Sequence, residues 1–76
     1  MISMLKGTHF YYADRDKRKP VICIVQAVNL EYPNTIFAKR TDTDKIIRCY
    51  DGFGCYHLDE YDEAYADAQI QEKRII

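Results

Sequence analysis

The chain has 76 residues, which is enough for one small domain and too few for two hydrophobic cores. Its 47% hydrophobic and 30% charged residues are typical of a globular domain and argue against a disordered chain, in which apolar residues are fewer and net charge is larger. The net charge of −1 gives no whole-molecule reason to expect nucleic acid or an anionic membrane as partner. Large multidomain enzymes and long solenoids are excluded, and no apolar run approaches the ~18 residues of a membrane span.

The N-terminal segment and the cysteines indicate a compartment. The apolar stretch Met1–Leu5 is too short for a signal peptide, and Lys6 follows it directly. The three cysteines, Cys23, Cys49 and Cys55, are an odd number and do not suggest a framework of disulfides. We therefore expect a cytoplasmic protein with reduced thiols.

Two elements are predicted before residue 31. The aromatic-rich segment Lys6–Tyr12 is typical of a strand, with Gly7 marking a bulge or bend, and Ala13–Pro20 is expected to be a charged loop. The next strand, Val21–Leu30, contains the uncharged run VICIVQAV.

Both faces of that run are mostly apolar. One face carries Val21, Cys23, Val25 and Ala27, and the other carries Ile22, Ile24 and Val28 together with Gln26. A strand that is apolar on both faces is typically buried on both. We therefore expect the sheet either to curl into a barrel or to be covered by a helix.

Short strands and turns alternate after this run. The predicted strands are Thr35–Arg40, Lys45–Tyr50 and Cys55–His57, and the predicted turns are Glu31–Asn34, Thr41–Asp44 and Asp51–Gly54. Such short connections indicate antiparallel neighbours.

The apolar period then changes to that of a helix, from about Asp59 to Arg74. The helical stripe consists of Leu58, Tyr61, Tyr65, Ala68 and Glu72, with Ala64 beside it. Asp59 is the predicted N-terminal cap. The whole of residues 1–76 is thus expected to form one domain, with a β portion over about 5–58 and an acidic helix over about 59–74.

This order of elements, with a loop-rich first connection followed by tight turns, resembles the small SH3-like barrels, including the KOW and Tudor types. The resemblance covers roughly residues 5–58, lies at the level of the fold and rests on no motif, so it implies no particular function. The fold class expected is mostly β with a C-terminal helix. The alternative is an α+β arrangement, in which the helix lies across one face of an antiparallel meander.

Residues with reactive side chains do not form a recognisable catalytic or metal-binding pattern. Cys49, Cys55 and His57, with Cys23 elsewhere, lack the paired CxxC-type knuckles of structural zinc sites. Cys55 and His57 share a face of an extended strand, but so small a domain offers little room for the pocket that a nucleophile requires. We expect no catalytic residues, no cofactor and no metal.

The acidic helix is the first candidate for a binding surface, because carboxylates and tyrosines together fit a basic groove of another protein. The candidate residues are Asp59, Glu60, Tyr61, Asp62, Glu63, Tyr65 and Asp67. The helix has a second interpretation, in which it folds onto the basic loop of its own domain. Residues 1–56 hold nine basic and six acidic residues, whereas residues 57–76 hold two and six.

Basic residues interleaved with aromatics form the second candidate, since cations neutralise phosphates and aromatic rings stack on bases. Its members are Tyr11, Tyr12, Arg15, Lys17, Arg18, Lys19, Lys39 and Arg40. The first hypothesis is a non-catalytic binding or regulatory module that acts on another protein, as an inhibitor or adaptor of the kind that phages and mobile elements often encode. The alternative is a nucleic-acid-binding barrel, and a homodimer through a sheet edge or aromatic patch is a further hypothesis.

Overall fold

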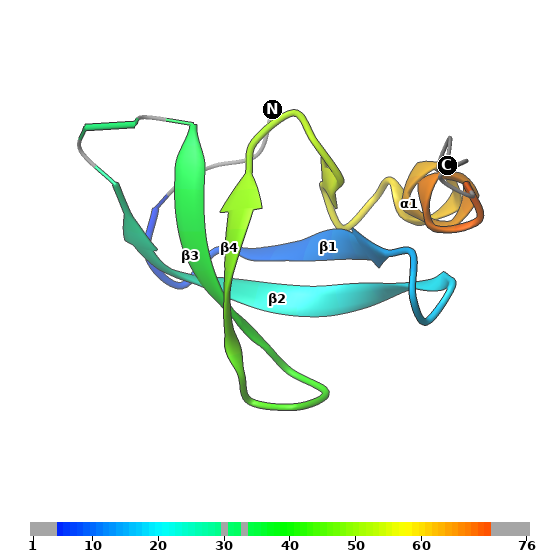
Figure 1. Ribbon diagram of the computed structural model, residues 1–76, viewed down its shortest axis with the longest axis horizontal. Coiled ribbons are helices and arrows are strands. Elements are labelled where there is room, and N and C mark those ends of the chain that lie inside the picture. Colours follow the sequence, from blue (N-terminus) through cyan, green and yellow to red (C-terminus); the bar gives the residue numbers. More distant parts are fainter. Residues whose placement is uncertain (1–4, 30, 33, 71–76) are drawn as a thin grey trace, which may run out of the picture.

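The computed structural model describes residues 5–29, 31–32 and 34–70, which form an antiparallel sheet followed by a helix (Figure 1). The elements are β1 (His9–Asp14), β2 (Lys19–Val28), β3 (Thr35–Arg40), β4 (Ile46–Tyr50), β5 (Cys55–Tyr56) and α1 (Tyr61–Ala68). The predicted class, mostly antiparallel β with a C-terminal helix, is confirmed. Among the described residues, no helix has the length and apolar character needed to cross a membrane.

The strands lie in the order β4-β3-β2-β1-β5, so only β5 leaves the simple meander and returns to pair with β1. The long strand β2 joins the two halves of the sheet: Lys19–Ile24 pairs with β1, and Cys23–Val28 pairs with β3. The sheet bends between these halves, and β3 and β4 cross β1 and β2 at a steep angle (Figure 1). This open sheet is compatible with both the SH3-like barrel and the α+β arrangement.

The hydrophobic core lies on one face of the bent sheet, called the inner face. Its fully or almost fully buried members are Phe10, Val21, Cys23, Val25, Ile36, Ala38 and Cys49. They come from β1, β2, β3 and β4, and Tyr12, Ile47 and Cys55 pack against them. Because directly opposed residues of antiparallel strands point to the same side, the pairs Phe10–Cys23 and Val25–Ala38 place one continuous apolar layer on this face.

A β-bulge in β2 changes the predicted face of Ala27. The register shifts between Val25 and Ala27, so that Val28, and not Ala27, lies opposite the buried Ile36. The extra residue at Gln26 reverses the alternation of the strand. Ala27 is therefore exposed, where the sequence predicted it on the same face as Val21, Cys23 and Val25.

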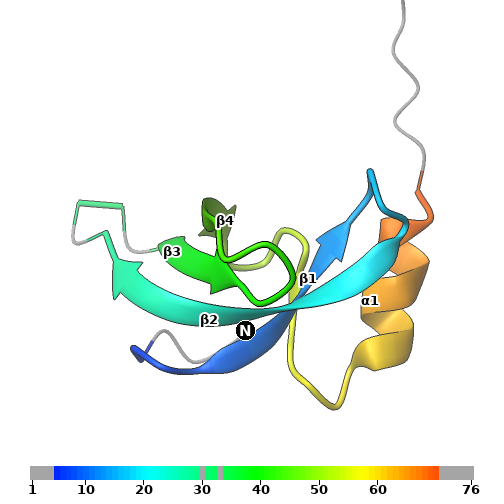
Figure 2. The same ribbon diagram turned by 90° about the horizontal axis from the view of Figure 1, so that it is seen from below.

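The prediction that β2 is buried on both faces is wrong. On the outer face Ile22 is 36% exposed, and Ile24 is only partly buried. The helix packs against β1, β2 and β5, at one end of the sheet (Figure 2). It therefore covers the outer face near the β1–β2 turn and leaves the rest of that face open to solvent.

The start of β1 differs from the predicted Lys6–Tyr12. Gly7 has a φ of 89°, and the Thr8 N–H donates to the carbonyl of Leu5, so the chain turns before the strand begins at His9. The expected bend at Gly7 is thus confirmed.

The first connection is a tight turn, and not the long charged loop expected over Ala13–Pro20. One carboxylate oxygen of Asp14 accepts the backbone N–H groups of Asp16 and Lys17, at 3.0 and 3.2 Å. This local hydrogen bonding closes the turn and lets both strands extend into the charged segment, with Ala13 paired to Pro20.

The helix begins later and ends earlier than the predicted Asp59–Arg74. Glu60, and not Asp59, is the N-cap residue, and the helix ends at Ala68. The buried positions are Ala64 and Ala68, whereas Tyr61 and Tyr65 of the predicted stripe are 47% exposed. The stripe member Glu72 and the predicted end of the helix at Arg74 lie outside the described residues, as does Leu30 at the end of the predicted second strand.

Candidate protein-binding surface

The helix is fixed to its own sheet by polar contacts around Asp67. The Asp67 carboxylate accepts from the Arg15 guanidinium, at 2.9 Å from Nη2 and 3.2 Å from Nε, and from the Tyr56 hydroxyl at 2.5 Å. The Gln69 side-chain amide donates to the Arg18 carbonyl at 2.6 Å. The acidic helix therefore folds onto the basic turn of its own domain, as the second interpretation of the sequence expected.

Asp67 consequently differs from the other acidic candidates. Its side chain is only 12% exposed, because Arg15 and Tyr56 enclose it. The hydrogen bond to Asp67, together with burial, raises the pKa of Tyr56 to about 12, so the phenol stays protonated at neutral pH. Asp67 thus holds the helix in place and is not available to a partner.

The three tyrosines Tyr11, Tyr61 and Tyr65 form one cluster on the surface, called the tyrosine cluster. Tyr11 comes from β1 and meets Tyr61 edge to face, with ring centroids 5.4 Å apart. Tyr61 and Tyr65 lie one helical turn apart and stack at 6.3 Å, with an angle of 27° between the rings. The sequence assigned Tyr11 to the nucleic-acid candidate and the other two to the acidic helix, and the fold joins them.

Asp62 borders this cluster, and other acidic side chains lie near it in the chain. Asp59, Asp62 and Glu63 are exposed and form no ion pair within the described part of the chain. Asp62 follows Tyr61 directly, so about 100° of helical rotation places it at the border of the tyrosine pair. Glu60 has a structural role, because its carboxylate accepts the backbone N–H of His57 at 2.9 Å and closes the turn before the helix.

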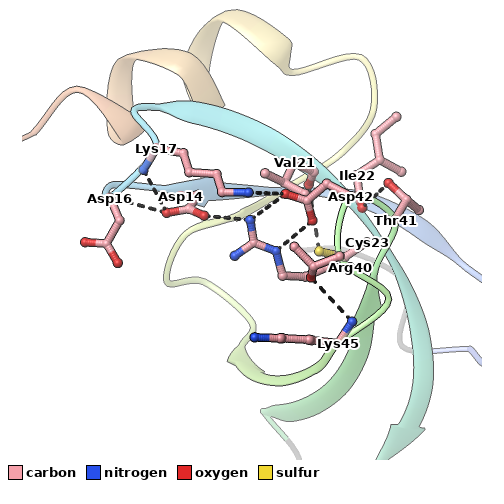
Figure 3. Close-up of polar contacts among 11 residues, drawn as sticks. Asp14, Asp16, Lys17, Val21, Ile22, Cys23, Arg40, Thr41, Asp42 and Lys45 are labelled. Carbon is pink, nitrogen blue, oxygen red and sulfur yellow. Dashed lines mark hydrogen bonds and ion pairs between the residues drawn. The ribbon is translucent and has the colours of Figure 1, made fainter.

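The residues of the nucleic-acid candidate are spread over several surfaces, and most of its cations are already paired. Arg40 lies between two carboxylates, at 2.7 Å from Asp14 and 2.8 Å from Asp42, and Lys17 reaches Asp42 at 2.8 Å (Figure 3). Lys39 lies 3.8 Å from Asp44.

Three of the remaining members, Tyr12, Arg15 and Arg18, line one pocket of about 870 Å³, and the acidic residues Asp14, Asp16 and Asp67 line the same pocket. Arg15 binds Asp67, and Tyr12 belongs to the inner face, where it packs against the core. Arg18, with a φ of 55°, and Lys19 are exposed at the β1–β2 turn. The sequence predicted a basic patch because Asp42 was placed only in a turn. The structure shows that Asp42 also pairs with Lys17 and Arg40.

The ion pairs shift the pKa values of both carboxyls that bind Arg40. Hydrogen bonds from Arg40 and Lys17 hold the pKa of Asp42 far below its usual range. Burial alone would raise the pKa of Asp14, but the Lys17 backbone N–H and the Arg40 guanidinium outweigh it and lower that pKa. Both carboxylates are therefore charged at neutral pH, and the cations near them are neutralised.

The cysteines and histidines do not assemble into a reactive site. The Cys55 thiol points to the carbonyls of Tyr50 and Phe53, at 3.5 and 3.9 Å, and not to His57, which is exposed. The neighbouring Cys49 thiol and burial raise the pKa of Cys55, and burial raises that of Cys23 to about 12. Within the described residues, no group of three or more histidine, cysteine or acidic side chains is arranged to hold a metal ion.

No protein-family model matches the chain, and no significant match is found among curated proteins or among solved structures. The fold and the surface chemistry described above are therefore the basis for assigning a function.

Proposed function

We propose that this protein is a non-catalytic binding module that recognises a basic surface of another protein through the tyrosine cluster and the acidic residues beside it. The observation that carries the proposal is the contact of the partly buried Tyr11 with Tyr61 and of Tyr61 with Tyr65, the last two half-exposed, on two different elements. Aromatic rings of this kind supply most of the binding energy in many protein interfaces.

The anchoring of the helix supports this proposal. Because Asp67 and Gln69 tie α1 to the β1–β2 turn, the tyrosines are already ordered before a partner arrives. Association then loses less side-chain and backbone entropy than binding by a mobile helix would. The exposed carboxylates of Asp59, Asp62 and Glu63 would speed encounter with a positively charged partner. A module of this kind acts as an inhibitor or an adaptor.

The state of the thiols supports a non-catalytic function. A cysteine nucleophile needs a lowered pKa, access to substrate and an oriented base. The pKa of Cys55 is raised and its sulfur faces backbone carbonyls, whereas Cys49, whose pKa is lowered by its hydrogen bond with Cys55, is buried in the core. The nucleic-acid alternative has weaker support, because Arg15, Lys17, Lys39 and Arg40 are engaged by acidic side chains of the same molecule.

The proposal is tested by capturing partners from a host lysate with and without nuclease, using wild-type protein and variants as bait. We expect capture of a basic protein that survives nuclease treatment, is lost with Tyr61→Ala/Tyr65→Ala and is weakened by Asp62→Lys. Phe53→Ala is the matched control, since Phe53 is 79% exposed and lies in the β4–β5 connection. Capture that depends on nucleic acid, or that is equal for the wild type and the Tyr61→Ala/Tyr65→Ala variant, would contradict the proposal.

A further inference from the structure

The strand β4 forms one edge of the sheet, on the opposite side from β5 and the helix. The backbone hydrogen bonds at its two ends define which residues bond to β3. The Arg40 N–H donates to the carbonyl of Lys45, and the Asp51 N–H donates to the carbonyl of Asn34. In an antiparallel ladder such bonded pairs alternate with non-bonded pairs.

This alternation fixes the direction of every backbone group in β4. Counting from the Arg40–Lys45 pair, Ile47 and Cys49 bond to Ala38 and Ile36, whereas Ile46, Arg48 and Tyr50 turn their backbone groups away from β3. The carbonyl of Tyr50 accepts from the Phe53 N–H. Within the described residues, the other outward groups of β4 form no hydrogen bond, so this edge is a template for an additional strand.

The side chains of those same three residues lie on the outer face and are exposed. Arg48 lies over the ring of Tyr50, with Cζ 5.7 Å from the ring centroid, and forms no ion pair within the described part of the chain. A pocket of about 320 Å³ adjoins it, lined by Asn29, Tyr32, Thr35, Arg48 and Tyr50. The strands β3 and β4 contain three cations and no acidic residue.

We propose that β4 accepts an extended segment of another protein as a sixth, antiparallel strand, with an acidic side chain of that segment beside Arg48 and apolar side chains beside Ile46 and Tyr50. The residue opposite Arg48 would exchange both backbone hydrogen bonds with it, and the residue opposite Ile46 would do the same. This surface is separate from the tyrosine cluster, and the inference does not depend on the proposed function.

The charge of Arg48 also decides against a second copy of the chain as occupant. Two β4 strands that pair antiparallel about their centres place Arg48 opposite Arg48, and like charges in directly opposed positions are destabilising. A central cation therefore discourages self-pairing of this exposed edge and favours a carboxylate from a different protein.

The test uses NMR titration with the synthetic peptide Ac-Thr-Val-Thr-Glu-Thr-Val-Thr-NH2, which carries Val, Glu and Val on one face of a strand. In the free protein we expect the amides of Ile46 and Arg48 to exchange with solvent faster than those of Ile47 and Cys49. At about 1 mM peptide the amides of Ile46 and Arg48 should shift and become protected. The same peptide with an N-methylated glutamate is the control and should not bind.

A charge exchange identifies the recognised group. Arg48→Glu should weaken binding of the glutamate peptide about tenfold and allow binding of the peptide in which lysine replaces glutamate. The restored binding also shows that the variant is folded. The inference is overturned if the glutamate peptide causes no shift in β4 or if the N-methylated peptide binds equally. It is also overturned if sedimentation velocity shows a dimer and the amides of Ile46 and Arg48 are protected from exchange without peptide.

Discussion

At the scale of single residues, Arg40 was a candidate for binding nucleic acid, but in the structure it forms ion pairs within the molecule. It stands in β3 opposite Cys23, at the border of the core, and its side chain is only 14% exposed. Asp14 and Asp42 bring together the ends of β1 and the β3–β4 turn through this one guanidinium (Figure 3). Arg40, which the sequence suggested as a ligand for phosphate, thus connects β3 with the end of β1 and with the β3–β4 turn. Lys17 adds a further ion pair to Asp42.

The first prediction concerns pH. A carboxyl whose pKa is lower in the folded than in the unfolded state contributes stability above the unfolded value of about 4, and this contribution is lost as the pH falls through the folded value. Asp14 and Asp42 both have lowered pKa values, so the free energy of unfolding should decrease as the pH drops below about 4.

The variant Asp14→Asn tests this assignment. It should cost about 1–3 kcal/mol at neutral pH, because Arg40 loses one of its two carboxylate partners and keeps Asp42. The free energy of unfolding of this variant should also decrease less than that of the wild type as the pH falls below about 4. Urea unfolding at a series of pH values measures both effects, and Asp16→Asn, at an exposed position of the same turn, is the control. An unchanged acid dependence in Asp14→Asn would show that other groups govern it.

At the scale of elements, three alanines determine how the helix meets the sheet. Ala64 and Ala68 are fully buried and Ala13 is 5% exposed, so the helix is joined to the sheet by the smallest apolar side chains. Such a joint brings the backbones close together, and it places Tyr61 near enough to Tyr11 for ring contact. It also explains why the larger residues of the predicted stripe are left at the surface.

A second prediction follows for this joint. Ala64→Leu should lower the free energy of unfolding by about 1–3 kcal/mol, because a larger side chain forces the helix away from β1. Ala66→Leu on the exposed side of the same helix should change it by less than about 0.5 kcal/mol. Chemical denaturation compares the two variants, and near-ultraviolet circular dichroism reports the tyrosine cluster. Equal stability of both variants would contradict this packing.

The elements show what the sequence can and cannot reveal. The strand Thr35–Arg40 was predicted with both of its ends, because turns with clear residue signals flank it. The start of β1 and the first turn were predicted wrongly, since they depend on the carboxylate of Asp14 and on the φ of Gly7. The face of Ala27 depends on a bulge, for which a single uncharged run gives no signal.

The sequence allowed most residues of the candidate site to be predicted, but not which of them lie together in the structure. The helix tyrosines and carboxylates were found from their spacing, whereas the inclusion of Tyr11 depends on the packing of α1 against β1. The low exposure of Asp67 could not be predicted either, because its partners Arg15 and Tyr56 are 52 and 11 residues away in the chain.

At the scale of the whole molecule, one ion pair joins the basic portion of the chain to the acidic helix, and the other ion pairs of the described residues lie within the first 56 residues. The basic turn meets the helix through Arg15 and Asp67, and the cations of β3 meet Asp14, Asp42 and Asp44. The segregation of charge along the sequence therefore does not become an equally strong segregation in space. The two proposed binding surfaces are separate: the tyrosine cluster lies at the helix, and Arg48 lies at the opposite edge of the sheet.

The third prediction applies to the molecule as a whole. Because Arg15, Lys17, Lys39 and Arg40 are paired with acidic side chains of the same molecule, the wild-type protein should show no measurable affinity for single-stranded DNA or RNA, even at about 50 mM salt. Fluorescence anisotropy with labelled oligonucleotides measures this, and Asp42→Ala, which releases Lys17, provides a comparison with more free positive charge. Binding by the wild type that falls steeply with added salt would support the nucleic-acid alternative instead.

The burial of Cys23 and Cys49 within the inner face has a practical consequence. An alkylating reagent reaches these sulfurs only when strands separate, so the rate of their labelling measures how often the sheet opens under native conditions. Cys23 lies in the central strand, whereas Cys49 lies in the edge strand β4. The two cysteines therefore report on two parts of the sheet. Faster alkylation of Cys49 than of Cys23 would show that the edge strand β4 separates from the sheet more often than the central strand β2 does.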